Sequence, residues 1–204
     1  MKKIIDIFLR SLLTGVAIAI GGTVYLSCPN KYLGAFFFGI GLFVILSFGF
    51  NLFTGKVGYA VENKPSYLGE LGIIWLGAVI SALLITQTRI STISDKATEL
   101  CNIKLGDNIT SVFILSFFCG ILMFVAADGY KTIQNPVGQI LAIFLPVVVF
   151  ILSGFEHCVA NMYFFTIADL WSIKAFGYLI IMSLGNSIGG ILIPLLRKGF
   201  VSKA

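Results

Sequence analysis

An acidic side chain and an imidazole stand together in one of the most apolar parts of this sequence. Glu156 and His157, the single histidine of the chain, lie within ILSGFEHCVANMYFF, residues 151–165. An ionisable residue inside a membrane-length apolar segment usually faces the protein interior or a cavity and marks a pathway. Histidine changes its charge in the physiological pH range without a large shift. The pair indicates either a proton-exchanging site or a buried histidine that pins one helix to another through Glu156.

The composition places these residues in a lipid environment. Of the 204 residues, 58% are hydrophobic and 11% are charged, and the mean hydropathy is +1.00. A soluble domain carries about 25% charged residues, so the sequence predicts an all-α integral membrane protein. Its length leaves room for a single domain, residues 1–204. The net charge of +5 comes from scattered basic residues, which argues against a nucleic-acid partner.

Apolar segments of about 20 residues, the length of a transmembrane helix, occur six times. Short polar connections separate them. We expect a multi-pass protein whose six transmembrane helices cover approximately residues 11–27, 31–60, 70–88, 108–128, 137–168 and 173–196. An even number of spans places both termini on one side of the membrane. More of the basic residues fall on that side, which favours cytoplasmic termini.

The second and fifth segments are longer than one crossing requires, and they contain glycine and polar residues. The interruptions read SFGFNLFTGK and LSGFEHCVANM. Aligning Gly49–Leu52 with Gly154–His157 gives an offset of 105 residues, half of the chain. We therefore predict two three-helix repeats, approximately 1–105 and 106–204, the second inverted relative to the first, with broken second and fifth helices. Two long, tilted helices with ordinary kinks are the alternative.

Three motifs resemble the signatures of the formate/nitrite transporter family of bacterial anion channels. They are SGFEHCVANM at residues 153–162, NLFTG at 51–55 and LGNSIGG at 184–190. The resemblance extends over nearly the whole chain. It implies an aquaporin-like fold in the bacterial inner membrane and a homopentamer in which each protomer has its own pore. It also implies that small monovalent anions, such as formate, nitrite and hydrosulfide, pass through that pore.

The resemblance also assigns roles to residues of this chain. His157 corresponds to the family's central pore histidine, and Thr54 and Asn186 correspond to its hydrogen-bond partners. Glu156 and Asn161 correspond to polar residues that brace the broken fifth helix. The apolar residues that narrow the family's pore on either side of the histidine correspond to Phe38, Leu42, Leu52 and Phe150.

The chain departs from the family's pattern at positions that bear on selectivity. The acidic residue before Leu-Phe-Thr is Asn51 here, and the small or amide residue after that motif is Lys56. A lysine near the outer start of the fourth span is replaced by Asn108, with Lys104 one turn earlier. We expect Asn51, Lys56 and Lys104 to act as structural braces or at the mouths of the pore. Further departures are Ala78, Met123 and Phe124.

A histidine between apolar constrictions allows a pore to exchange a proton with an entering anion. A bare anion loses its hydration at a large cost in such a passage, whereas its neutral acid loses much less. Thr54 and Asn186, together with the N-termini of half-helices, can offer fixed donors to the anion. We therefore expect a channel for small monovalent anions, with a proton as second partner, whose flux depends on pH through His157. We expect Glu156 to brace free backbone N–H groups.

Two other functions fit parts of the pattern. In an aquaporin-like pore for small neutral solutes the histidine only shapes the filter, and Glu156, His157 and Lys56 argue against this. A membrane enzyme would need paired acids, several histidines or a nucleophile with its base, and a single histidine supplies little of this. We expect no cofactor and no metal, because the four cysteines lack metal-like spacing. Cys28 and Cys101 fall on the predicted outer face and are either disulfide-bonded or free.

Overall fold

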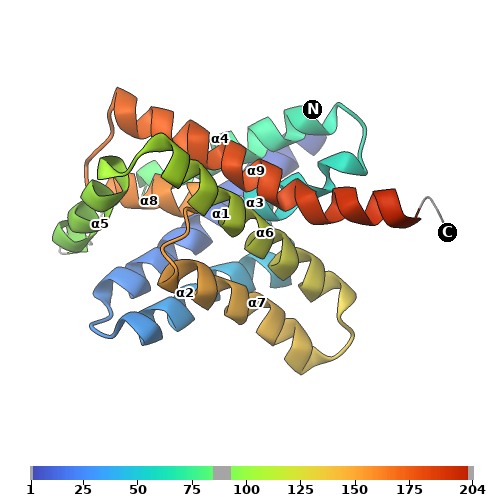
Figure 1. Ribbon diagram of the computed structural model, residues 1–204, viewed down its shortest axis with the longest axis horizontal. Helices are drawn as coiled ribbons and strands as arrows, with labels where there is room; N and C mark the ends of the chain where they lie inside the picture. Colours follow the sequence, from blue (N-terminus) through green and yellow to red (C-terminus); the bar gives the residue numbers. More distant parts are fainter. Residues whose placement is uncertain (1, 85–92, 202–204) are drawn as a thin grey trace.

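The computed structural model describes residues 2–84 and 93–201, and every regular element in these ranges is a helix. Figure 1 shows how the helices are arranged. In chain order they are α1 (Lys2–Ser27), α2 (Lys31–Ser47), α3 (Phe53–Lys56), the 3-10 helix η1 (Val57–Val61), α4 (Tyr67–Leu84), α5 (Ser94–Gly106), α6 (Ile109–Thr132), α7 (Pro136–Leu152), α8 (Cys158–Ile167) and α9 (Ile173–Val201). The fold is all-α, as predicted.

Three helices, α1, α6 and α9, are individually long and apolar enough to cross a membrane. The other apolar helices, α2, α4, α7 and α8, are shorter. A helix of 17 residues, the length of α2 and of α7, spans roughly 26 Å. That is less than the hydrocarbon core of about 30 Å, and both helices are followed by a break and a further short helix. Helices are stable in the hydrocarbon core of a membrane because they satisfy their own backbone N–H and C=O groups.

Both predicted breaks are present. Residues 48–52 separate α2 from α3, and residues 153–157 separate α7 from α8. The chain turns within them at Gly49 and Gly154, whose φ angles are +66° and +69°. Glycine reaches this left-handed conformation without the steric penalty that a Cβ brings. The alternative of two continuous, kinked helices is therefore wrong.

Hydrogen bonds of the first half of the chain recur in the second half at an offset of 105 residues. Asn30 caps α2 and Asn135 caps α7, and each side chain accepts from two backbone N–H groups. Three backbone bonds from an N–H to a carbonyl oxygen also recur. The bond from Phe48 to Val44 matches that from Ser153 to Val149, the bond from Phe50 to Ile45 matches that from Phe155 to Phe150, and the bond from Asn51 to Arg10 matches that from Glu156 to Leu115. In addition, α1 packs against α2 and α4, and α6 packs against α7 and α9. The halves are built alike, while their inverted relation stays a prediction.

Helix α5 corrects one part of the sequence analysis, which left residues 89–107, between the third and fourth predicted spans, as a polar connection. The buried residues of α5 are Ala97 and Cys101, and the helix packs beside α8. Two small side chains one turn apart do not form the wide apolar stripe by which a surface helix is recognised. The expected third span, residues 70–88, ends outside the described residues.

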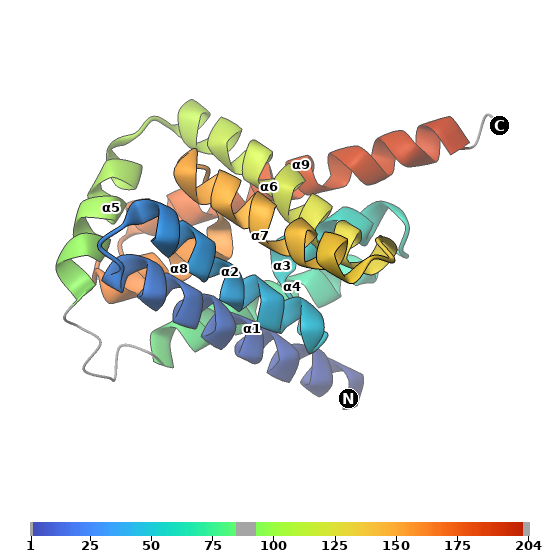
Figure 2. The same ribbon diagram turned by 90° about the horizontal axis from the view of Figure 1, so that it is seen from below.

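The molecule has two ends that frame the site. In Figures 1 and 2 both chain termini and the α6–α7 connection lie towards one end, which we call the termini end. Helix α5 and the α1–α2 connection lie at the opposite end, which we call the α5 end. Between these ends α2 and α7 pack side by side. Asn51 and Leu52 of the first break and Glu156 and His157 of the second are buried, so the breaks enter the interior.

Candidate functional site

The two breaks meet at a hydrogen bond between Thr54 and His157. Thr54 lies in the short helix α3, directly beyond the first break, and His157 is the last residue of the second break. Thr54 Oγ1 and His157 Nε2 are 2.8 Å apart. Thr54 is 0% exposed and His157 is 2% exposed, so the bond is closed to bulk solvent. It joins the two halves of the chain where a helix in each is interrupted.

The other imidazole nitrogen starts helix α8. The backbone N–H of Ala160 donates to His157 Nδ1 at 3.0 Å, so His157 is the N-cap of that helix. A ring nitrogen that accepts a hydrogen bond carries no proton, and the neutral imidazole then has its proton on the other nitrogen. Nε2–H is therefore the donor to Thr54, whose hydroxyl keeps its own hydrogen for another acceptor. The hydrogen bond from the Ala160 N–H at the start of α8 therefore selects the tautomer with its proton on Nε2.

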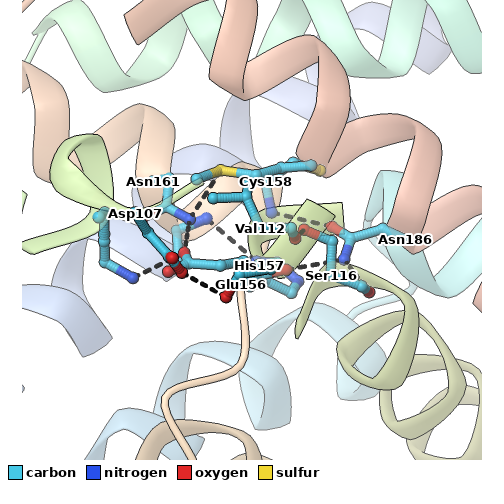
Figure 3. Close-up of polar contacts among 12 residues, drawn as sticks. Asp107, Val112, Ser116, Glu156, His157, Cys158, Asn161 and Asn186 are labelled. Carbon is cyan, nitrogen blue, oxygen red and sulfur yellow. Dashed lines mark hydrogen bonds and ion pairs between the residues drawn. The ribbon is translucent and has the colours of Figure 1, made fainter. Parts of the chain in front are cut away.

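Asn186 of α9 secures the backbone on either side of the histidine (Figure 3). Its side-chain NH₂ donates to the carbonyl oxygens of Ser116 at 2.7 Å and Glu156 at 2.8 Å, and its Oδ1 accepts from the Cys158 N–H at 2.9 Å. The amide thus holds the Glu156 carbonyl and the Cys158 N–H at the break and also binds a carbonyl of α6, whereas the expected partner was the ring. Helices α6 and α9 are close here: a Cβ at Gly120 would lie 2.2 Å from Asn186 O.

The carboxylate of Glu156 binds two side chains (Figure 3). Lys104 Nζ and Asn161 Nδ2 each lie 2.7 Å from Glu156 Oε2. The side chains of Lys104 and Glu156 are 10% and 5% exposed, so a largely buried ion pair connects α5 to the second break. Glu156 was expected to brace free backbone N–H groups, but its carboxylate partners are side chains because Lys104 reaches it from α5. Its own N–H donates to Leu115 O at 3.4 Å.

Aromatic rings cover the Thr54–His157 pair on the α5 side. The ring centroid of Phe150 lies 5.6 Å from that of His157 and 5.7 Å from that of Phe38, which it meets edge to face. A cavity of about 50 Å³, lined by Phe38, Phe150 and Lys104 among others, lies beside these rings. Leu42, another expected constriction residue, is 1% exposed in the core.

A second cavity, of about 90 Å³, lies on the termini side. Leu52, Lys56 and Lys131 line it together with residues from the end of α2. Leu52 is the N-cap residue of α3 and is 2% exposed. Of the four expected constriction residues, Phe38 and Phe150 thus line the α5-side cavity and Leu52 lines the termini-side cavity.

Lys131 did not belong to the site residues predicted from the sequence. It lies in the last turn of α6, and its ammonium group is 4.1 Å from the centroid of the Tyr59 ring. The sequence shows it only as one lysine in a polar connection, and its place beside Lys56 arises from the packing of α6 on α3. Asn51, by contrast, is a brace: its side-chain NH₂ donates to Ile7 O of α1 at 3.3 Å.

The cysteines are free thiols. Cys28 is partly exposed, whereas Cys101, Cys119 and Cys158 are buried. Burial raises the pKa of the Cys101 thiol to about 12, against the opposing effect of the Lys104 charge. A thiol in this state is inert, because the thiolate is the reactive form. Among the residues that the structure describes, no group of three His, Cys, Asp or Glu side chains could hold a metal ion.

Known proteins are similar to this chain in sequence. The profile of the family Formate/nitrite transporter matches residues 1–198. An uncharacterized transporter of Bacillus subtilis (strain 168), YrhG, is 29% identical over 181 residues, which cover 79% of this chain and 68% of that protein. The formate channel FocB of Escherichia coli (strain K12) is 24% identical over 188 residues, which cover 78% of this chain and 65% of that protein.

Solved structures are similar to this chain in three dimensions. A structure described as a pentameric formate channel with formate bound gives a TM-score of 0.84 at 22% identity and covers 100% of this chain and 99% of that one. An FNT family ion channel gives a TM-score of 0.77 at 20% identity, over 97% and 89% of the two chains. These structures share the fold, and the family profile matches nearly every residue. The chain belongs to the formate/nitrite transporter family.

Proposed function

We propose that this chain forms a channel for small monovalent anions of the formate, nitrite and hydrosulfide class. The observation that carries the proposal is the buried contact between Thr54 and His157, which lies where two helix breaks meet. Membership of the formate/nitrite transporter family supports a role in transport across a membrane, and the Escherichia coli relative is named as a formate channel. The relatives described above are transporters and channels, which supports a role other than catalysis.

The pair offers an anion a hydrogen-bond donor inside an apolar passage. Thr54 accepts from His157 Nε2–H and can donate its own hydroxyl hydrogen to a passing anion. The buried apolar side chains of Phe38, Phe150 and Leu52 line the cavities on the two sides of the pair. Stripping an ion of its hydration in such surroundings is far more costly than stripping its neutral acid. An anion that gains a proton at this point therefore crosses the passage at a lower cost in desolvation free energy.

His157 can supply that proton only as an imidazolium. A second proton must add at Nδ1, which then releases the Ala160 N–H. The imidazolium gives its Nε2 proton to the Thr54 oxygen while the hydroxyl hydrogen moves to the anion. A neutral acid and a neutral ring result, and the ring returns to its capping tautomer by proton exchange. We therefore propose that flux rises as the pH on the side of anion entry falls.

We also propose a homopentamer in the bacterial inner membrane, with both termini in the cytoplasm. Large apolar side chains are exposed on most of the described helices, and examples are Ile20, Phe37, Ile114, Leu145 and Leu184. Such a surface suits contact with lipid and with neighbouring protomers. Native mass spectrometry in detergent is expected to show five times the protomer mass. Monomers or tetramers alone would contradict the proposed assembly.

Flux into proteoliposomes tests the proposed function. Uptake of formate, nitrite, hydrosulfide, chloride and glycerol is compared between vesicles with and without the purified protein. We expect formate, nitrite or hydrosulfide to enter faster than chloride and glycerol. The matched variant is Thr54→Val, which keeps the side-chain shape and removes the hydroxyl, and it should slow the favoured anion. Glycerol uptake without anion uptake would establish a pore for neutral solutes instead, and uptake of none of these solutes would refute a channel.

A further inference from the structure

The cavity on the termini side carries an excess of positive charge. Lys56 and Lys131 both line it. Lys56 interacts electrostatically with Lys131 and Arg10, which are both positive, and with one carboxylate, that of Glu70. The charges that act on Lys56 are therefore mainly of its own sign.

Three carboxylates of this part of the molecule, those of Asp6, Glu70 and Asp128, are already paired with other cations. The ion pairs are Lys3 with Glu70, Arg10 with Asp6 at 3.0 Å, and Arg197 with Asp128 at 2.6 Å. Within residues 2–84 and 93–201, no carboxylate forms an ion pair with Lys56 or with Lys131. The two lysines therefore face the cavity with charge that the described part of the protein does not neutralise.

The Lys131 side chain and the Lys56 backbone are held in place at the cavity. The ammonium group of Lys131 lies over the Tyr59 ring, and the Tyr59 hydroxyl donates to Asp128 Oδ1 at 3.4 Å. Lys56 is partly buried, and its backbone carbonyl accepts from the Tyr67 hydroxyl at 3.1 Å. A side chain that is already positioned, such as that of Lys131, loses less conformational freedom when it binds a ligand.

The cavity on the α5 side differs in charge. Lys104 lines it, but Lys104 forms an ion pair with Glu156 at 2.7 Å. The two cavities therefore differ: the lysine that lines the α5-side cavity is paired with a carboxylate, and the two lysines that line the termini-side cavity are not. A cleft with one sign of charge and walls of low dielectric raises the local concentration of ions of the opposite sign.

We propose that Lys56 and Lys131 form an anion-binding site in the termini-side cavity, which holds a small monovalent carboxylate or oxyanion before it reaches Thr54. This inference rests on the proposed function, because it names the place where the permeating anion is collected. The cavity of about 90 Å³ has room for an anion the size of formate. Leu52 and Gly55, which lie on either side of Thr54 in the sequence, line the same cavity as Lys56, so the site lies against the segment that carries the Thr54 hydroxyl.

Removal of the Lys56 charge tests the site in proteoliposomes. Lys56→Met keeps the length of the side chain and leaves Thr54 and His157 in place. We expect the formate concentration at half-maximal uptake to rise at least about fivefold, as for the loss of one partly screened charge contact, with the maximal rate changed by less than about twofold. Lys56→Arg should behave as the unmodified protein. Lys64→Met removes an exposed lysine outside the cavity and should change neither quantity.

Equilibrium binding separates the site from transport. Saturation-transfer NMR on the formate proton gives a dissociation constant for the detergent-solubilised pentamer. We expect Lys56→Met to weaken binding by the same factor and Lys64→Met, which removes an exposed lysine outside the cavity, to leave it unchanged. If Lys56→Met does not purify as a pentamer, Lys131→Met supplies the same comparison from the α6 side of the cavity.

The outcomes distinguish the two proposals. Formate binding that depends on Lys56 in a protein that transports no anion would establish the site and refute the channel. Formate transport whose half-saturating concentration and dissociation constant are the same in the unmodified protein, Lys56→Met and Lys131→Met would overturn the site and leave the channel standing.

Discussion

Gly49 and Gly154, 105 positions apart, hold the same left-handed backbone conformation, with φ angles of +66° and +69°. Space does not require glycine at either position. A Cβ at Gly154 would meet nothing within 4 Å, and one at Gly49 would meet only Arg10 Nη1, at 3.7 Å. The requirement is conformational, and it is the same at both breaks.

Alanine at either glycine should therefore lower the free energy of unfolding by about 1–2 kcal/mol, the penalty of a Cβ in the left-handed region. The measurement is the thermal unfolding midpoint of the detergent-solubilised protein. Gly177→Ala is the matched control: Gly177 lies inside α9, also with nothing within 4 Å of a Cβ. That change should stabilise the helix by roughly 0.5–1 kcal/mol. Gly154→Ala with an unchanged midpoint would contradict the conformational requirement.

A second prediction concerns His157. Asparagine caps helices well, so His157→Asn can accept from the Ala160 N–H while it lacks a titrating ring. We expect a folded pentamer whose anion uptake no longer depends on pH between about 5 and 8, the range in which histidine changes charge. Residual uptake is allowed, because an anion or its neutral acid can pass without a relay. An unchanged rate and an unchanged pH profile would leave His157 as a structural residue only.

His157→Leu separates the two contacts of the ring. Leucine cannot accept from the Ala160 N–H, so the loss of the cap should lower stability by about 1 kcal/mol relative to His157→Asn. Both variants should lack the pH response. A pH response that persists in either variant would locate the titrating group elsewhere.

A third prediction concerns the buried ion pair between Lys104 and Glu156. Lys104→Met leaves the carboxylate without its cation, and breaking a buried pair in this way lowers stability by about 3–5 kcal/mol. The double variant Lys104→Met with Glu156→Gln should recover most of that loss, because no charge remains buried. Lys31→Met, at an exposed position, should change stability by less than about 0.5 kcal/mol. A double variant no more stable than Lys104→Met would show that the unpaired Glu156 carboxylate is not the cause of the lost stability.

A fourth prediction uses the cysteines to determine sidedness. Cys28 is partly exposed in the α1–α2 connection, at the end opposite the chain termini. With the termini in the cytoplasm, a membrane-impermeant maleimide added to intact cells should label Cys28. Cys101 should stay unlabelled, since burial raises its pKa to about 12 and thiolate forms only as the pH approaches the pKa. Cys28→Ser should abolish labelling. Labelling of Cys28 only after the membrane is opened would place the termini outside.

The sequence was sufficient to predict both breaks because each puts glycine and polar residues into an apolar run, and because the same pattern returns half a chain later. The resemblance to the family singled out Thr54 as a partner of His157, and the structure places the two side chains 2.8 Å apart. Three features were not predictable. Helix α5 buries two small residues, the amide of Asn186 binds peptide groups, and Lys131 reaches the termini-side cavity. Each depends on the packing of distant segments, which leaves no periodic mark in the local sequence.

The two contacts of His157 have a consequence for how this position can change over time. One nitrogen begins a helix and the other holds a hydroxyl in the opposite half of the chain. Small polar residues can take over the first task, but their side chains are too short for the second. A second mutation that stabilises the protein elsewhere can offset a lost cap, since stability is shared by the whole fold. Such a mutation cannot restore the contact between the ring and the Thr54 hydroxyl, so under the proposed relay the position tolerates substitution far less than its share of the folding energy suggests.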